Sequence, residues 1–166
     1  MEQPFHNTMT RVVAKFDQLP AFMRRWARSK AFGSKVKFAG TAKIDFEEVS
    51  SERVVVSIRN RGPVQNHIKG VHAAAMALLA ETATGFAVGM NLPDDKLPLI
   101  KTMKVDYLRR AQGDLKAVAQ LRPEQIAEVR SLDKGEVLVP VTVTDESGAE
   151  PIRCEMTWAW IPKQRK

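Results

Sequence analysis

Residues 66–85 read NHIKGVHAAAMALLAETATG, a stretch that holds two of the three histidines of the chain. The segment from about residue 70 to 90 has the length of a helix, is rich in alanine and is apolar on nearly every side. A helix without a polar face has to be buried in the protein. A carboxylate is unexpected in a buried helix, so the presence of Glu81 has to be explained.

Strands are predicted on both sides of this helix, because apolar and polar residues alternate there with a period of two. Two strands precede the helix, at residues 36–47 and 54–58. The segments with the same alternation after the helix are 100–110, 114–121, 135–144 and 152–160. Pro140 interrupts the third of these and indicates a sheet edge or a bulge. Trp158 and Trp160 are expected on the packed face of the last strand.

The order of these elements predicts an α+β fold. Strands joined by short connections pair as antiparallel neighbours, and a helix that is apolar all round needs a sheet wrapped around it. An antiparallel sheet around one long central helix is the hot-dog fold, and residues 35–166 are expected to form it. Residues 1–34 are expected to be a helical extension in front of this domain.

The N-terminal extension is basic and amphipathic. Residues 1–38 hold eight Lys or Arg and two acidic residues, so they carry +6 of the formal net charge of +7. Thr8 or Thr10 can cap a first helix, Pro20 interrupts it, and Gly33 is predicted to end a second one. The aromatic side chains expected to pack over the sheet are Phe16, Phe22 and Trp26, with a membrane-surface role as the alternative.

Composition excludes several classes of protein. With 166 residues and 44% apolar content, the chain is expected to be one globular domain. No apolar stretch reaches the roughly 18 residues that a membrane helix needs, and the N-terminus lacks the pattern of a signal peptide. A lone cysteine, Cys154, cannot form an internal disulfide. A cytoplasmic location without stable membrane insertion is therefore expected.

The stretch from Asn66 to Glu81 resembles the signature of hot-dog acyl-CoA thioesterases of the phenylacetate-pathway (PaaI) type. In that family an asparagine is followed by a glycine, by His-Gly-Gly and by an acidic residue on the helix. Here His72 follows Asn66 by six positions, Gly70 lies between them, and Glu81 follows His72 by nine. These spacings match the family's, and the order of elements matches over roughly residues 36–161.

The resemblance implies a thioester hydrolase that acts on an acyl-CoA. Such a reaction needs an activated water and hydrogen-bond donors for the oxyanion. Glu81 is predicted to be the general base, with direct nucleophile as the alternative role, and its burial is expected to raise its pKa. The N–H of His72 or Ala73 at the helix start is the expected oxyanion donor, and Asn66 is expected to orient water or substrate. No cofactor is implied, and His67 and His72 have a poor spacing for a metal site.

The spacing of His72 and Glu81 constrains the site. Nine residues at about 100° each place the two side chains on opposite sides of the helix and about 13 Å apart along it. One chain cannot bring both into one pocket, so the site has to be shared between subunits. A homodimer or a dimer of dimers is expected, which agrees with what the resemblance implies. Glu81 is then tolerated because it faces a wet pocket at the interface.

Four further residues are candidates for substrate binding. Gly70 belongs to the family pattern. Thr102 lies on the polar face of the strand after the helix and could hold substrate or water. Arg109 and Arg110, at the end of that strand, could pair with the phosphates of coenzyme A. An exposed strand end is the alternative interpretation of the two arginines.

A departure from the family pattern supports a rival function. The two glycines after the histidine are Ala73 and Ala74 here, and their methyl groups narrow the approach of a thioester to the backbone. The alternative is therefore a non-catalytic hot-dog module that binds acyl-CoA or another lipid-like ligand. A nucleic-acid-binding regulator is not expected, because the basic prefix, with Pro20 in its middle, has no clear helix-turn-helix.

Overall fold

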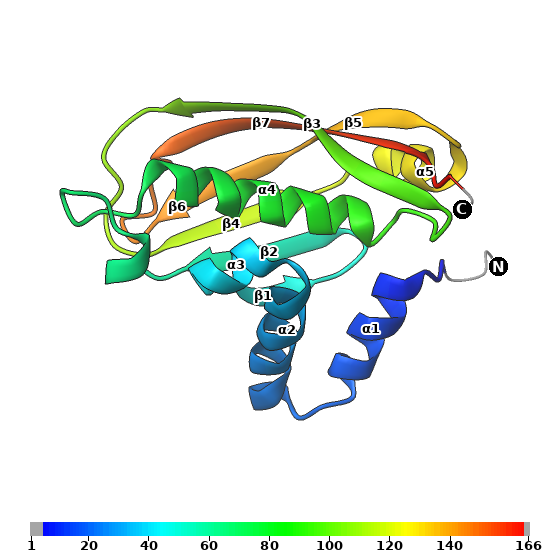
Figure 1. Cartoon of the computed structure of the whole chain (residues 1–166), viewed down its shortest axis with the longest axis horizontal. Helices are drawn as coiled ribbons and strands as arrows, with labels where there is room; N and C mark the ends of the chain where they lie inside the picture. Colours follow the sequence, from blue (N-terminus) through cyan, green and yellow to red (C-terminus); the bar gives the residue numbers. More distant parts are fainter. Residues whose placement is uncertain (1–4, 165–166) are drawn as a thin grey trace.

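A computed structural model describes residues 5–164 of the chain. Antiparallel strands curve around one long helix, α4 (Ala73–Gly89), which runs through the middle of the molecule (Figure 1). This is the helix predicted from its apolar composition, and Leu79, Ala80, Ala83 and Val88 are fully buried in it. The predicted α+β hot-dog architecture is confirmed.

The strands form two antiparallel groups, in the orders β1–β2–β4–β6 and β3–β7–β5. Their bounds are β1 (Asp45–Val49), β2 (Arg53–Ile58), β3 (Lys96–Tyr107), β4 (Leu115–Gln120), β5 (Gly135–Val139), β6 (Val141–Asp145) and β7 (Ile152–Pro162). The strand expected at 135–144 is divided into β5 and β6 at Pro140, where the chain passes from one group to the other. The division follows from the missing N–H of proline, which cannot donate to a strand ladder.

Residues 36–42 are not in a strand, so the prediction of a strand at 36–47 is wrong for its first half. The helix α2 (Ala21–Lys35) continues past Gly33, and a second helix, α3 (Lys37–Ala42), follows it. The two helices cross at a pair of glycines, because a Cβ on Gly40 would lie only 2.2 Å from the carbonyl oxygen of Gly33. Gly33 is therefore a helix contact and not the helix end that was expected.

The N-terminal helices α1 (Thr8–Asp17) and α2 project from the sheet as a pair and are separated at Pro20, as predicted (Figure 1). Asn7, and neither of the two expected threonines, caps α1 by accepting the N–H of Thr10 at 2.7 Å. Phe16 packs inward against Phe32, with ring centroids 6.0 Å apart. The prediction that Phe22 and Trp26 also pack over the sheet is wrong, because both side chains are exposed. The domain division at residue 34 stays a prediction.

Two short helical elements complete the fold, η1 (Gly62–Val64) and α5 (Pro123–Ser131). The period-two alternation gives no indication of α5, although Pro123 at the first helical position followed by Glu124 is a usual start signal. Within the described part of the chain, no helix combines the length and the apolar character needed to cross a membrane.

Candidate active site

Glu81 is the only charged residue of α4, and it lies in the wall of an apolar cavity of about 590 Å³. The other walls include Met9 of α1, Phe32 of α2 and Trp158 of β7. Glu81 is half-buried there. Burial raises the pKa of Glu81. A carboxylate with a raised pKa at an apolar cavity has the properties of a general base.

Thr82 is a candidate that the sequence pattern does not reveal. It is 3% exposed and lines the same cavity as Glu81. Its hydroxyl has no hydrogen-bond partner among residues 5–164. The hydroxyl of Thr84, two positions further on, is by contrast satisfied, because it accepts from the indole N–H of Trp158 at 2.9 Å and donates to the carbonyl of Ala80 at 2.9 Å. A buried hydroxyl without a partner is unfavourable and points to a ligand or a water at Thr82.

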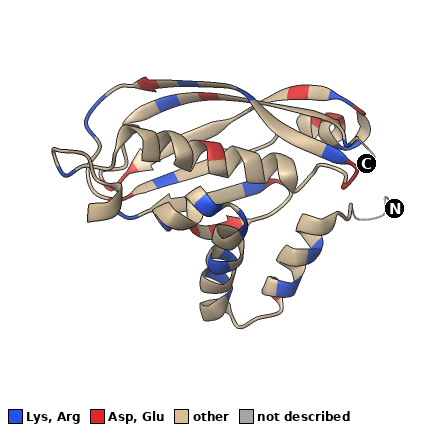
Figure 2. Cartoon of the chain, viewed as in Figure 1, with Lys and Arg blue, Asp and Glu red and all other residues tan. Residues whose placement is uncertain are grey.

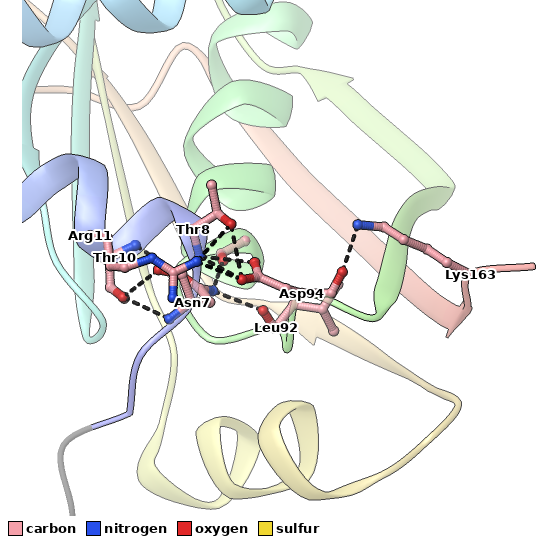
Figure 3. A network of polar contacts seen from close by, with 8 residues as sticks. Asn7, Thr8, Thr10, Arg11, Leu92, Asp94 and Lys163 are labelled. Atoms are coloured by element: carbon pink, nitrogen blue, oxygen red, sulfur yellow. Dashed lines mark hydrogen bonds and ion pairs between the residues drawn. The ribbon is translucent and has the colours of Figure 1, made fainter. Parts of the chain in front are cut away.

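A polar network fastens α1 beside the cavity (Figure 3). The buried amide of Asn7 donates to the carbonyl oxygens of Gly89 and Leu92, each at 2.8 Å. The carboxylate of Asp94 accepts the backbone N–H of Thr8 at 2.9 Å, and this bond is the main reason why the pKa of Asp94 is lowered. The network joins the start of α1 to the end of α4 and to the loop that follows it.

Two glycines of α4 shape the cavity. A Cβ on Gly85 would lie 2.7 Å from the ring of Trp158, and one on Gly89 would lie 2.9 Å from the Cε of Met9. The absence of these two side chains lets Trp158 and Met9 pack directly on the helix. Trp158 and Trp160 both lie on the packed face of β7, as predicted.

The start of α4 carries the second group of candidates. The Nδ1 of His72 accepts the N–H of Ala74 at 3.0 Å, and the N–H of His72 donates to the carbonyl of Val64 at 2.8 Å. The N–H of Ala73 has no hydrogen-bond partner in the described part of the chain, and Ala73 is exposed. Of the two N–H groups proposed as oxyanion donors, that of Ala73 is therefore free. The Tyr107 hydroxyl donates to the carbonyl of Ala73 at 2.9 Å and joins the helix start to the end of β3.

Asn66 closes the loop that leads into α4. Its Oδ1 accepts the N–H of Ile68 at 3.1 Å and that of Gly70 at 3.0 Å. Gly70 is buried and belongs to this turn rather than to a surface that a substrate could reach from outside. The amide nitrogen of Asn66 makes no hydrogen bond within residues 5–164, so it can still donate to a ligand.

The remaining predicted residues lie on and after β3. Thr102 is exposed on that strand, and Arg110 is exposed while donating to the carbonyl of Ile68 at 2.8 Å. Arg109 donates to the buried carboxylate of Asp145 at 2.8 Å. Burial raises the pKa of Asp145, but hydrogen bonds, among them that from Arg109, lower it to about 2. Arg109 is thus already paired, and Arg110 is the better placed of the two for an anion.

One chain does not bring the two groups of candidates together. Glu81 and Thr82 line the cavity, whereas Asn66, His72 and Ala73 lie outside it at the helix start. Among residues 5–164, no group of three or more His, Cys, Asp and Glu side chains could hold a metal ion. Burial raises the pKa of the Cys154 thiol to about 11, so this thiol is not a nucleophile near neutral pH.

Comparison with known families agrees with this architecture. A family model described as a domain of unknown function (DUF4442) matches residues 24–161. The chain belongs to this family. The match runs from α2 to β7 and contains both Glu81 and the start of α4. No curated protein matches the DUF4442 chain by sequence.

Solved structures similar to this DUF4442 protein include thioesterases. A Pseudomonas aeruginosa protein of unknown function, described as a probable thioesterase, is 23% identical with a TM-score of 0.73, over 87% of this chain and 97% of that one. A thioesterase variant from the same organism is 16% identical with a TM-score of 0.66, over 82% and 94%. A Staphylococcus aureus thioesterase variant is 17% identical with a TM-score of 0.64, over 76% and 99%. At these identities the likeness shows the fold, which is the hot-dog fold of thioesterases.

Proposed function

We propose that this protein is an acyl-CoA thioesterase whose active site is built from two subunits. Glu81 takes a proton from a water molecule, and the water oxygen attacks the thioester carbonyl carbon. The N–H of Ala73 binds the carbonyl oxygen as it becomes negative, and the amide of Asn66 orients the substrate. The C–S bond then breaks, the carboxylic acid leaves, and the thiolate of coenzyme A takes up a proton.

The observation that carries this proposal is the cavity of Glu81. Its lining is mainly apolar, which suits a medium to long, or aromatic, acyl group. The polar side chains of Glu81 and Thr82 lie side by side in sequence on one wall, where they can hold a water or the reacting carbonyl. Arg110 is the residue proposed to bind a phosphate of coenzyme A.

The strand β3 supports a shared site. It is an edge strand, and its exposed apolar side chains are Leu97, Leu99, Ile100, Met103 and Tyr107. An unpaired strand edge of this length, with exposed apolar side chains, is a template for another strand. The start of β3 lines the Glu81 cavity through Lys96 and Pro98, and its end is bonded to Ala73 through Tyr107.

A second copy can use this edge to complete the site. If two β3 strands pair antiparallel about a twofold axis, the start of one strand lies beside the end of the other. The helix start of one subunit then lies next to the Glu81 cavity of its partner. A homodimer, or a dimer of dimers, therefore unites the two groups of candidates that one chain keeps apart.

A non-catalytic module that binds acyl-CoA or a lipid-like ligand is the second candidate function. The observation in its favour is the pair Ala73 and Ala74, whose methyl groups are exposed at the free N–H of the helix start. Binding of acyl-CoA without release of thiol by the unaltered protein would select this function over hydrolysis.

The test of catalysis is Glu81→Gln, assayed by thiol release from a panel of acyl-CoAs. The substitution keeps size and hydrogen-bonding capacity but removes the base, so turnover should fall by at least about 100-fold without loss of melting temperature. Glu128→Gln is the matched control, because Glu128 is an exposed helix carboxylate on α5. Activity of Glu81→Gln within a few-fold of the parent would contradict the proposed base.

The test of the shared site is to mix two inactive chains. Asn66→Ala removes the helix-start half and Glu81→Gln removes the cavity half, so a mixed dimer should regain one intact site of two. Each variant mixed with itself is the control. If verified mixed dimers have no activity, then either Asn66 and Glu81 act within the same chain or one of them has no role in catalysis.

A further inference from the structure

The helix α2 buries Arg28 and Phe32 but leaves two aromatic side chains near its start in contact with solvent. Arg25 reaches the sheet and pairs with Asp45 at 2.9 Å, and Arg28 is buried and donates to a backbone carbonyl of β1. Phe22 and Trp26 point away from the protein, 83% and 63% exposed. With about 100° per residue, Phe22 and Trp26 lie roughly 40° apart and share the outer face, whereas the buried Arg28 lies about 120° or more from both. The arginines anchor the helix, and Phe22 and Trp26 lie outside the core that residues 5–164 form.

Lysines surround the exposed tryptophan. Lys30 continues the outer face of α2 one turn beyond Trp26, and the two residues line a groove between α2 and α3 together with Lys37 and Lys43. The acidic residue in this groove, Asp45, is already paired with Arg25. None of the three lysines makes an ion pair within residues 5–164. Figure 2 shows this concentration of basic residues on α2 and α3.

We propose that this surface, Phe22, Trp26, Lys30, Lys37 and Lys43, docks the protein on the face of an anionic lipid bilayer. Exposed aromatic rings beside lysines are the combination that interfacial helices use, because the rings enter the headgroup region while the ammonium groups meet lipid phosphates. The proposal does not depend on the thioesterase reaction.

The charges argue against a second copy as the occupant. A twofold contact through this surface would bring the same three lysines together from both chains without an unpaired carboxylate to offset them. Duplex nucleic acid would engage the lysines but would leave Phe22 in water, since a duplex offers no apolar layer to a protruding ring. A bilayer accommodates the rings and the lysines at once.

The test uses the full-length protein and vesicles of phosphatidylcholine, with or without about one part in three of phosphatidylglycerol. We expect flotation with the anionic vesicles only, reduced by added salt. Trp26 also supplies an internal reporter, because Trp158 and Trp160 are buried. Lipids brominated on their acyl chains should quench the tryptophan emission, and Trp26→Phe should abolish that quenching while flotation remains.

Paired variants distinguish vesicle binding through this surface from a general effect of charge or hydrophobicity. Phe22→Ser with Trp26→Ser, or Lys30→Gln with Lys37→Gln, should each weaken vesicle partitioning by about tenfold or more. The controls are Leu132→Ser with Leu138→Ser, which are exposed apolar residues on other elements, and Lys101→Gln with Lys134→Gln, which removes the same charge.

Three outcomes would overturn the proposal. The first is equal partitioning to neutral and anionic vesicles, or to neither. The second is an equal loss in the control variants. The third is a change of occupant, shown either by dissociation of the oligomer in the Phe22→Ser, Trp26→Ser variant or by tight, salt-sensitive binding of duplex DNA without vesicle binding. Melting temperatures of all variants establish that each one is folded.

Discussion

At the scale of single residues, Glu81 is a charged side chain that the fold keeps partly out of water. Burial raises its pKa, so the folded state favours the protonated form. The stability that this preference contributes is present below the pKa of the unfolded chain and is lost as the pH rises through the folded value. Glu81→Gln should therefore keep or slightly raise the melting temperature at neutral pH.

The same raised pKa predicts the pH dependence of activity. A general base works only when it is deprotonated, so kcat/KM should rise with pH along one ionisation whose midpoint lies above 4.5, the ordinary value for this group. The measurement is the rate of thiol release across the acidic range with a single acyl-CoA. A midpoint at or below the ordinary value would exclude Glu81 as the residue that limits the rate there.

Thr82 makes a separate prediction. Thr82→Val replaces a buried hydroxyl that has no partner, so the free energy of unfolding should stay the same or rise by about 1 kcal/mol, while turnover falls. Thr84→Val is the matched control, because it removes a hydroxyl bonded to Trp158 and should lower the free energy of unfolding by about 1–2 kcal/mol. Urea denaturation and thiol release measure the two effects. Equal destabilisation by both substitutions, with activity retained in Thr82→Val, would make Thr82 a purely structural residue.

At the scale of elements, the sequence predicts what periodicity and composition determine. The central helix and β7 each have a long, unambiguous pattern, and both were predicted in their places. The segment 36–42 has an apolar alternation of only a few residues, and there the close contact of Gly33 with Gly40 decides in favour of helices. Such a contact joins residues through space and leaves no periodic trace.

The residues of the candidate site likewise differ in whether the sequence alone reveals them. Glu81 stands out in the sequence because a charge on an apolar helix is conspicuous. The position of Thr82 does not, because a threonine in a helix is ordinary until the packing shows that its hydroxyl has no partner. Likewise, the sequence does not reveal which N–H at the helix start is free. Only the structure shows that the N–H of His72 is bonded to the carbonyl of Val64, which leaves Ala73 as the free donor of the two.

The helix α1 is the element that should set the length of the acyl group, if the proposed function holds. Met9 projects into the cavity and touches Gly89, and the Asn7 network holds the helix in place. Met9→Trp should fill part of the cavity, so KM should rise for long acyl-CoAs and stay nearly unchanged for short ones. Ala14→Trp is the control, because Ala14 is exposed on the same helix. A uniform change across chain lengths would mean that α1 does not contact the acyl group.

At the scale of the whole molecule, the β3 edge and the surface of α2 differ in character. The β3 edge is long and carries exposed apolar side chains, and the surface of α2 combines rings with lysines that make no ion pair within residues 5–164. The first suits a twofold partner that adds a strand, and the second suits an anionic surface. Because the two surfaces belong to different elements, variants of one should leave the function of the other unchanged.

The β3 edge gives the prediction that tests the assembly. Leu99→Lys with Met103→Lys places two charges on the exposed edge strand, where a paired copy would bring them next to the same charges of its partner. We expect a folded monomer by light scattering, with an unchanged cavity around Glu81 but turnover lowered by about 100-fold or more, because no partner supplies the Ala73 N–H. Leu138→Lys is the control, since Leu138 is equally exposed on β5, and it should remain an active oligomer. A Leu99→Lys, Met103→Lys monomer with parental turnover would show that one chain holds the complete site. An intact oligomer would place the interface on another surface.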